Sequence, residues 1–136
     1  MKQVFADTGY WIALLNPRDE LHDRARTVSL SMTSIQIVTS EWVLTELLNS
    51  FAERGSQFRI VAAKTVAALQ KSSGVFVVPQ SSASFAEAFQ LYQDRTDKSW
   101  SLTDCCSFLI MQQYGIDSAL TYDRHFEQAH FEALLR

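Results

Sequence analysis

Gly74-Val75-Phe76-Val77-Val78-Pro79 is the stretch that decides the fold of this chain. Three of its four apolar residues are β-branched, and a glycine and a proline bound the run, which is the pattern of a short buried β-strand. Segments with helical periodicity flank it at Ser56–Ser72 and Ser82–Tyr92. A buried strand between two helices indicates an α/β fold, because parallel strands need a long crossover connection.

The alternation of strand and helix signals continues toward both ends of the chain. Further apolar runs predict strands at Gln3–Ala6, Ile35–Val38 and Ser118–Thr121, with a last edge strand at Phe131–Leu135. Helical periodicity fills the intervals, at Thr8 to about Asn16, Asp19–Met32, Ser40 to about Arg54, Leu102–Tyr114 and a short helix from Arg124. We therefore predict one three-layer α/β domain over residues 1–136, in which helices cover both faces of a mostly parallel sheet of about five strands.

Composition and charge are those of an ordinary globular domain. The chain has 136 residues, of which 47% are hydrophobic and 20% charged, and this is enough for one sizeable core. The net charge of −3 counts against a protein that holds nucleic acid by overall positive charge, but not against a nuclease with a cation at the reacting phosphate. Such an enzyme needs only a local basic rim, for which the candidates are Arg18, Arg24, Arg26, Arg54 and Arg59.

The N-terminus, the cysteines and the histidines bear on where the protein is located and on whether it binds zinc. The short apolar stretch after Lys2 ends at Asp7, unlike a signal peptide, and no apolar run approaches the ~18 residues of a membrane span. We therefore expect a cytoplasmic protein without a membrane segment. Cys105 and Cys106 are adjacent and are expected to pack in the interior. The histidines lack zinc-binding spacing, so zinc is set aside.

Four carboxylates, dispersed in the sequence, are the candidates for chemistry. Asp7 and Asp123 come at the ends of predicted strands, and ligands of parallel sheets bind beyond the carboxyl ends of the strands. Glu46 and Asp104 lie on predicted helices, away from the residues of the expected apolar faces. Those residues are Val43, Leu44, Leu47, Leu48 and Phe51 in the first helix and Leu102, Cys105, Cys106, Leu109 and Ile110 in the second. All four carboxylates are therefore free to meet in one cleft.

A cluster of four carboxylates predicts a bound cation. Two carboxylates ~5 Å apart repel by roughly 3 kcal/mol at an effective dielectric constant of about 20. Four together raise one another's pKa values unless a cation neutralises them. Oxygen ligands of this kind suit Mg²⁺ or Mn²⁺. Such a cation assists phosphodiester hydrolysis by polarising a phosphoryl oxygen and lowering the pKa of a bound water.

Each carboxylate also has an ordinary structural explanation. Asp7 and Asp123 stand where the N-cap of a following helix is expected. Asp104 follows Ser101 by three residues, which is nearly a capping box, and Glu46 is explained as a solvated side chain. The residues alone leave both interpretations open.

Four stretches that contain these acids occur in the order and at the spacing of a known family. They are Phe5-Ala6-Asp7-Thr8-Gly9-Tyr10-Trp11-Ile12-Ala13-Leu14, Thr39-Ser40-Glu41-Trp42-Val43-Leu44-Thr45-Glu46, Trp100-Ser101-Leu102-Thr103-Asp104-Cys105 and Leu120-Thr121-Tyr122-Asp123-Arg124-His125-Phe126. With these stretches the chain resembles the PIN-domain ribonucleases, and among them the VapC-type toxins of bacterial and archaeal toxin–antitoxin pairs. The resemblance covers essentially the whole chain and implies a PIN-like fold. One departure is His130, where relatives often carry glycine.

The resemblance assigns a role to each acid. It implies that Asp7 and Asp104 bind a metal ion directly. Glu46 and Asp123 would then bind the metal through water, hold a second ion or position the nucleophile. The positions that the resemblance marks as supporting this cluster are Thr8, Thr121 and Asp97.

The implied activity is that of a Mg²⁺- or Mn²⁺-dependent endoribonuclease that leaves 3′-hydroxyl and 5′-phosphate ends. Arg124, next to the fourth acid, is a candidate contact for a substrate phosphate. A small antitoxin protein and a homodimer are the implied protein partners, and Trp11 and Trp42 are candidates either for an interface or for the core. The kind of RNA, whether tRNA, rRNA or mRNA, is left open.

Three other functions fit parts of the pattern. Asp7-Thr8-Gly9 spells the signature of aspartic proteases, but their fold is all-β and this chain is rich in helical periodicity. An inactive PIN scaffold would bind RNA or a protein, and the presence of all four acids argues against it. A housekeeping nuclease outside toxin–antitoxin pairs, or a flap-type DNA nuclease, is a further alternative, although the flap-type enzymes usually carry long insertions that this chain lacks.

Overall fold

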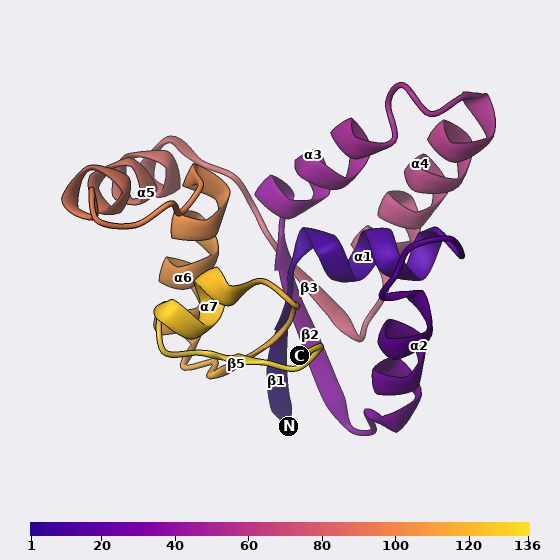
Figure 1. Cartoon of the computed structure of the whole chain (residues 1–136), viewed down its shortest axis with the longest axis horizontal. Coiled ribbons are helices and arrows are strands. Elements are labelled where there is room, and N and C mark those ends of the chain that lie inside the picture. Colours follow the sequence, from indigo (N-terminus) through magenta and orange to yellow (C-terminus); the bar gives the residue numbers. More distant parts are fainter.

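Five parallel strands form the central sheet in the computed structural model, which describes residues 1–136 (Figure 1). Their order across the sheet is β3-β2-β1-β4-β5. The strands are β1 (Lys2–Ala6), β2 (Ile35–Ser40), β3 (Val75–Val78), β4 (Ser118–Leu120) and β5 (Glu132–Ala133). All four pairings are parallel, so the sheet is wholly parallel where a mostly parallel one was predicted. The predicted α/β class and strand number are confirmed.

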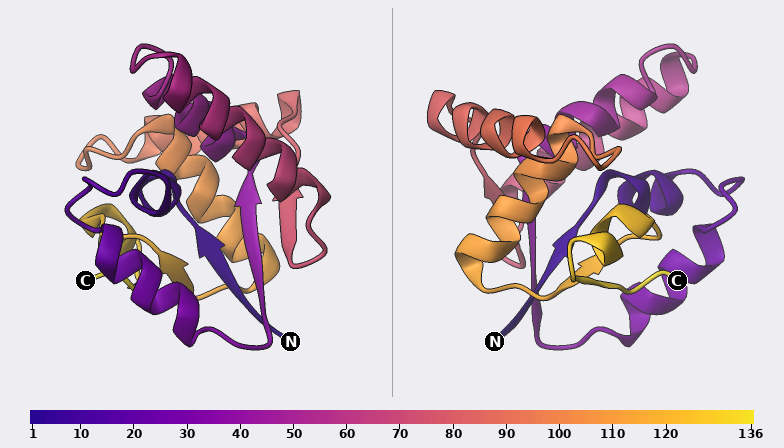
Figure 2. Two further views of the ribbon diagram at one scale, coloured as in Figure 1. Left: turned by 90° about the vertical axis from the view of Figure 1, so that its right-hand side faces the viewer. Right: turned by 60° about the vertical axis from the view of Figure 1, so that its left-hand side comes forward.

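Seven helices connect the strands and cover both faces of the sheet (Figure 1). They are α1 (Thr8–Leu15), α2 (His22–Ser31), α3 (Glu41–Ser50), α4 (Ser56–Lys71), α5 (Ser82–Asp94), α6 (Leu102–Tyr114) and α7 (Arg124–Gln128). The helices α1 to α4 lie on one face and α5 to α7 on the other, and Figure 2 shows α6 behind the strands when α2 is in front. No helix combines the length and the apolar character that a membrane crossing needs.

The change of face defines where a ligand site belongs. The chain moves outward from β1 through β2 to β3, then returns to place β4 on the other side of β1. Because right-handed crossovers in opposite directions put their helices on opposite faces, the two sets of helices separate between β1 and β4. In open α/β sheets, ligands bind at this switch point, beyond the carboxyl ends of the strands.

Aromatic packing fixes α7 against the sheet and against α6. The ring of Phe126 lies 6.5 Å from that of Phe5 in β1 and 5.0 Å from that of Phe108 in α6, measured between centroids. All three side chains are buried. Offset and edge-to-face pairs of this kind add to the free energy gained by apolar burial. The helix that follows β4 is thereby held beside the N-terminal half of α6.

Several element boundaries differ from the prediction. The second helix begins at His22 instead of Asp19, because residues 17–21 form turns in which the Asp19 carboxylate accepts a hydrogen bond from the Leu21 amide at 2.9 Å. The third helix ends at Ser50, before the expected Arg54. Gly55, at φ 94°, occupies the N-cap position of α4, so it separates the two helices and does not cap α3. Strand β5 is shorter than predicted.

The predicted apolar faces of two helices are also partly wrong. In α6, Phe108 and Met111 are fully buried on the same side as Asp104, whereas Leu102 and Leu109 are only half-buried. This helix packs against α5 and also contacts α3 and α7, so more than one of its sides is covered and one apolar stripe does not describe it. In α3, Leu48 is 38% exposed although it was expected in the core.

The turn after α7 explains the departure at His130. The amides of Phe131 and His130 donate to the carbonyls of Phe126 and Glu127, both at 2.9 Å, which is a Schellman motif. The motif requires the left-handed conformation, and His130 has φ 71°. Gly115 occupies the same position after α6, with φ 65°. A side chain stands at His130 where glycine is the unstrained residue.

Replacing His130 by glycine should therefore raise the free energy of unfolding. The left-handed conformation costs a non-glycine residue ~1–2 kcal/mol, which the glycine variant avoids. Glycine also gives the unfolded chain more conformational freedom, and this offsets part of the gain in stability. We expect a net gain of about 0.5–1 kcal/mol for His130→Gly in urea-induced unfolding. The matched control is Gly115→Ala, which has open space for a Cβ and should lose about 1 kcal/mol through strain alone. Equal stability of all three proteins would contradict this account of the turn.

Candidate active site

A cleft of about 460 Å³ opens beyond the carboxyl ends of β1 and β4. It is lined by the four acids and the two threonines singled out in the sequence, which are Asp7, Thr8, Glu46, Asp104, Thr121 and Asp123. The acids come from four different elements, yet the parallel sheet and the helices that start at its edge bring them together. The cleft therefore lies at the switch point of the sheet.

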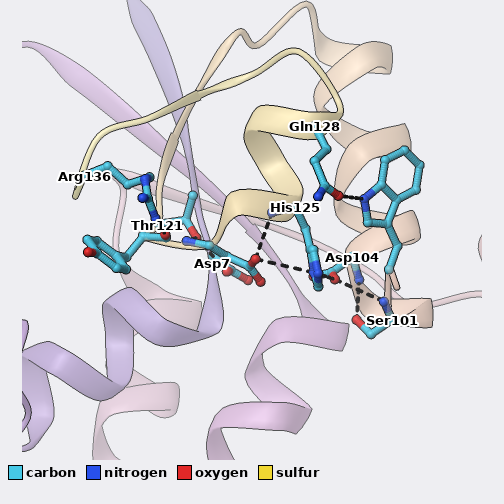
Figure 3. A network of polar contacts seen from close by, with 10 residues as sticks. Asp7, Ser101, Asp104, Thr121, His125, Gln128 and Arg136 are labelled. Atoms are coloured by element: carbon cyan, nitrogen blue, oxygen red, sulfur yellow. Dashed lines mark hydrogen bonds and ion pairs between the residues drawn. The ribbon is translucent and has the colours of Figure 1, made fainter. Parts of the chain in front are cut away.

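Asp7 is the most deeply buried acid of the cluster. Its amide donates to the Leu120 carbonyl at 3.2 Å, which joins the ends of β1 and β4. The Thr121 hydroxyl donates to Asp7 Oδ2 at 3.0 Å and accepts from the Asp123 amide at 3.0 Å (Figure 3). One hydroxyl thus links the first and the fourth acid. Asp7 stands at the N-cap position of α1 without a capping hydrogen bond from its side chain, so capping does not account for it.

The pKa of Asp7 is raised to about 7. Burial is the main cause, because the carboxylate loses water around its charge. The negative charges of Asp104 and Glu46 raise it further, while hydrogen bonds from the Thr8 amide and the Thr121 hydroxyl lower it in part. A buried carboxylate that holds its proton near neutral pH, beside two further acids, is a candidate for a functional site.

Glu46 is held in the cleft by the other threonine. Thr8, at the start of α1, donates its hydroxyl hydrogen to Glu46 Oε1 at 2.6 Å. This bond ties α1 to the middle of α3 across the edge of the sheet. Trp42, one turn earlier on α3, is half-buried and stacks on Phe85 of α5 at a centroid distance of 6.1 Å. The face of α3 that carries Glu46 is therefore partly covered.

Asp104 is fixed by two donors on one oxygen. Its Oδ2 accepts from the Ser101 amide at 3.0 Å and lies 2.9 Å from His125 Nδ1 (Figure 3). The Ser101 hydroxyl accepts from the Asp104 amide at 3.0 Å, which completes the capping box at the start of α6. Burial raises the pKa of Asp104, the Ser101 amide and His125 lower it, and the charge of Asp123 raises it. The hydrogen bonds to this carboxylate are both made by Oδ2, which leaves Oδ1 without a protein donor.

His125 is the residue of this site that sequence reasoning missed. Its Nδ1 also lies 3.4 Å from Asp123 Oδ1, and ligand atoms of Asp104, Asp123 and His125 all fall within 4.8 Å of one another. Because both neighbours are carboxylates, Nδ1 carries the hydrogen. The sequence signal that could have identified His125 is its position two residues after Asp123. Asp123 Oδ1 accepts a hydrogen bond from the His125 amide at 2.9 Å and so caps α7. The histidines had been considered only as zinc ligands.

The C-terminal residue shapes one wall of the cleft. Arg136 donates from Nη1 to the Tyr122 carbonyl at 3.0 Å, and its guanidinium lies 4.5 Å from the centre of the Tyr122 ring. Its Nε pairs with Glu127 at 3.1 Å. Tyr122 lines the cleft and is half-exposed, so the last residue of the chain holds an aromatic ring at the opening.

Other residues singled out in the sequence lie elsewhere. Asp97 is exposed in the loop between α5 and α6, where two 3.0 Å bonds from Arg95 lower its pKa to about 2, and it does not line the cleft. Arg124 is exposed at the start of α7 and also lies outside the cleft wall. Arg18 and Arg54 line a separate hollow beside Phe58. Trp11 is 5% exposed and belongs to the core.

The composition of the cleft fits a hard divalent cation. Four carboxylates line it, and neither a lysine nor an arginine does. Lysine and arginine therefore do not neutralise the cluster, and the pKa of Asp7 is raised mainly by burial and further by the charges of Asp104 and Glu46. Oxygen donors suit Mg²⁺ or Mn²⁺ better than softer metals. The residues that could hold such an ion are Asp7, Glu46, Asp104 and Asp123.

Comparison with known proteins gives a consistent family. The family model described as PIN domain matches residues 4–132. A Mycobacterium tuberculosis protein named 23S rRNA-specific endonuclease VapC20 is 30% identical over 128 residues, which cover 94% of this chain and 95% of that protein. The crystal structure of M. tuberculosis VapC20, described as a Sarcin-Ricin loop cleaving toxin, has a TM-score of 0.83 at 29% identity and covers 94% of this chain and 95% of its own.

A second solved structure shares the fold. FitAcB from Neisseria gonorrhoeae has a TM-score of 0.66 and covers 96% of this chain and 95% of its own, at 17% identity. At that identity the likeness extends to the fold alone.

The raised pKa of Asp7 predicts how stability changes with pH in metal-free protein. Unfolded Asp7 releases its proton near the ordinary aspartate pKa of 3.8, whereas folded Asp7 keeps it to about pH 7. Between these values the folded state binds more protons, so the free energy of unfolding falls as pH rises. Asp7→Asn removes this dependence, and its stability relative to wild type should grow by roughly 4 kcal/mol from about pH 4 to about pH 7.

Urea unfolding in EDTA across this pH range measures the difference. The control is Asp97→Asn, an exposed acid whose pKa is lowered, so that its removal should not reproduce the effect. A stability difference between Asp7→Asn and wild type that stays constant with pH would refute the raised pKa of Asp7.

Proposed function

This chain belongs to the PIN-domain family, and we propose that it is an endoribonuclease that hydrolyses RNA phosphodiester bonds with the help of Mg²⁺ or Mn²⁺. Membership confirms the resemblance to PIN-domain ribonucleases of the VapC type. One observation carries the proposal: four carboxylates without a compensating lysine or arginine line one cleft at the switch point of the sheet.

Two alternatives are weakened by the same geometry. An aspartic protease is excluded by the fold, which is a parallel α/β sheet instead of an all-β structure. An inactive scaffold has no use for a buried acid whose charge is disfavoured, because burying it lowers stability at neutral pH. A divalent cation bound between the carboxylates would neutralise their negative charge, and a metal-dependent nuclease needs such a cation at its active site.

When bound, the cation would polarise a phosphoryl oxygen and lower the pKa of an attacking water. Asp7 and Asp104 are the direct ligands in our proposal, and Oδ1 of Asp104 is presented because Oδ2 is occupied by its two donors. Glu46 keeps Oε2 free, since Oε1 accepts from Thr8. We assign to Oε2 the orientation of the water and the acceptance of its proton. Asp123 supports the cluster from its capping position.

Ribosomal RNA is the substrate class that the relatives favour. The M. tuberculosis relative carries 23S rRNA in its name, and its structure is described as that of a toxin. We therefore propose a structured rRNA as the first substrate to test and a small antitoxin as the partner that restrains the activity. A homodimer stays a prediction.

Trp42 is a candidate for a protein interface. The aromatic surface nearest to it is formed by the half-exposed rings of Phe85 and Phe89 on α5.

The first experiment is cleavage of purified ribosomes and total RNA by the protein freed of partners. Cutting should occur with Mg²⁺ or Mn²⁺ and stop in EDTA. Asp104→Asn should lower the rate more than about 100-fold, because loss of a direct ligand exceeds the loss of an outer-shell partner. The control Glu53→Gln removes an exposed acid just beyond α3 and should cut at the wild-type rate. Wild-type rates from Asp104→Asn would refute the site, and folded but inactive wild type would favour the scaffold.

His125 is a positioning residue in this proposal, and it has a test of its own. His125→Ala removes one donor from Asp104 Oδ2 and should weaken Mn²⁺ binding by about 10–100-fold, with a similar loss of cleavage. His125→Asn places an amide nitrogen at the same distance from the backbone as Nδ1 and should recover most of both. Mn²⁺ affinity is measured by electron paramagnetic resonance. If the alanine variant binds Mn²⁺ as tightly as wild type, the contact has no role in orienting Asp104.

A further inference from the structure

We propose that the groove beside the cleft, along the loop between α5 and α6, binds the nucleotide next to the scissile phosphate, with its phosphate at Lys98 and Arg95 and its base against Tyr92. The groove has a volume of about 360 Å³ and is lined by Tyr92, Arg95, Thr96, Lys98, Ser99 and Trp100, among others. This inference rests on the proposed RNA cleavage and adds the surface that holds the substrate.

The groove continues directly from the cleft. Ser99 lines both hollows, and Ser101, two residues on, donates its amide to Asp104. A chain of nucleotides that places one phosphate over the carboxylates can therefore place the next one along this loop. The hollow at Arg18 and Arg54 also carries two cations, but it shares no residue with the cleft.

Because the cleft is acidic, RNA binding requires positive charge on a neighbouring surface. RNA carries a negative charge at each phosphate, and the cleft offers four carboxylates and no lysine or arginine. The whole chain has a net charge of −3, so overall attraction does not hold the substrate. Lys98 and Arg95 supply two positive charges beside the acids, and Asp97 offsets one of them.

The cations and the aromatic groups of the groove are arranged to receive a nucleotide. The Arg95 guanidinium lies 4.8 Å from the centre of the Trp100 ring. Figure 3 shows the hydrogen bond that Trp100 Nε1 donates to Gln128 Oε1 of α7 at 3.0 Å. The arginine thus rests on a buried and hydrogen-bonded indole. Asp97 uses the Arg95 Nε and one Nη2 hydrogen, so that hydrogens on both Nη atoms remain for a phosphate.

Tyr92 and Lys98 are the less constrained members of the groove. The Tyr92 side chain is 51% exposed, which leaves a ring face for stacking of a base without sequence preference. Lys98 Nζ lies 3.8 Å from Asp97 Oδ2, too far for a hydrogen bond, so its donors are free for a phosphate oxygen. A charged contact and a stacking contact at neighbouring positions are the combination that single-stranded RNA needs.

The test compares binding and cleavage in the same variants. Binding of a fluorescently labelled mixed-sequence oligoribonucleotide is measured by anisotropy in EDTA over a range of KCl concentrations, and cleavage by kcat and KM with the metal present. Lys98→Gln should weaken binding about fivefold at about 0.1 M salt and reduce the salt slope by about one contact, with kcat unchanged. Tyr92→Ala should weaken binding without changing the slope, and Tyr92→Phe should restore it.

The direction in which Asp97→Asn changes RNA affinity is the decisive result. If the groove binds RNA, this variant should bind it more tightly, because Arg95 and Lys98 lose their competing anion. A role of Asp97 in supporting the metal predicts lower kcat instead, and that result would overturn the groove. The control Lys64→Gln removes an exposed lysine on α4, on the other face of the sheet, and should change neither quantity.

The failure of this inference is distinguishable from the failure of the proposed function. Wild-type protein that cuts RNA while Lys98→Gln and Tyr92→Ala keep its KM, affinity and salt slope would overturn the groove alone. Wild-type protein that does not cut, with Lys98→Gln binding the oligoribonucleotide as tightly as wild type, would overturn both.

Discussion

The crowding of four carboxylates at one edge of the sheet is the constraint on which the rest of the structure depends. Each acid is brought there by a different element, and the pKa of about 7 at Asp7 shows how strongly burial and neighbouring charges oppose ionisation. Hydrogen bonds from two threonine hydroxyls hold the carboxylates in place: Thr121 donates to Asp7 and Thr8 donates to Glu46. The hydrogen bond from the Asp7 amide to Leu120 keeps the two central strands in the register that aligns these donors.

Helix capping and the proposed metal binding use the same side chains in this site. Asp104 completes the capping box of α6, and Asp123 caps α7, while both line the cleft. The N-terminus of a helix carries partial positive charge, which favours a nearby carboxylate. The hydrogen bond from the Ser101 amide accordingly lowers the pKa of Asp104, against the effect of burial. The structural and the functional interpretation, which the sequence left as alternatives, describe the same residues.

The sequence predicts what local patterns encode. The run Val75–Val78 and its counterparts predict strands because burial and β-branching act within a few residues, and the order of parallel strands brings Asp7 and Asp123 to one edge. The burial of α6 on more than one side depends on its packing against α5, α3 and α7, which the periodicity of one helix cannot reveal. The contact of His125 with Asp104 joins residues 21 apart through the packing of Phe126, so sequence reasoning missed it.

Separation of charge explains why the groove and the cleft are distinct. A lysine inside the cleft would pair with the carboxylates and compete with the divalent cation for them. Placing Lys98 and Arg95 one loop away leaves the acids free for the cation and still provides positive charge for the RNA. The loop is anchored at Trp100 to α7 and at Ser101 to Asp104, so the two sites keep a fixed distance. In our proposal, substrate that enters the groove is thereby aligned with the carboxylates without neutralising them.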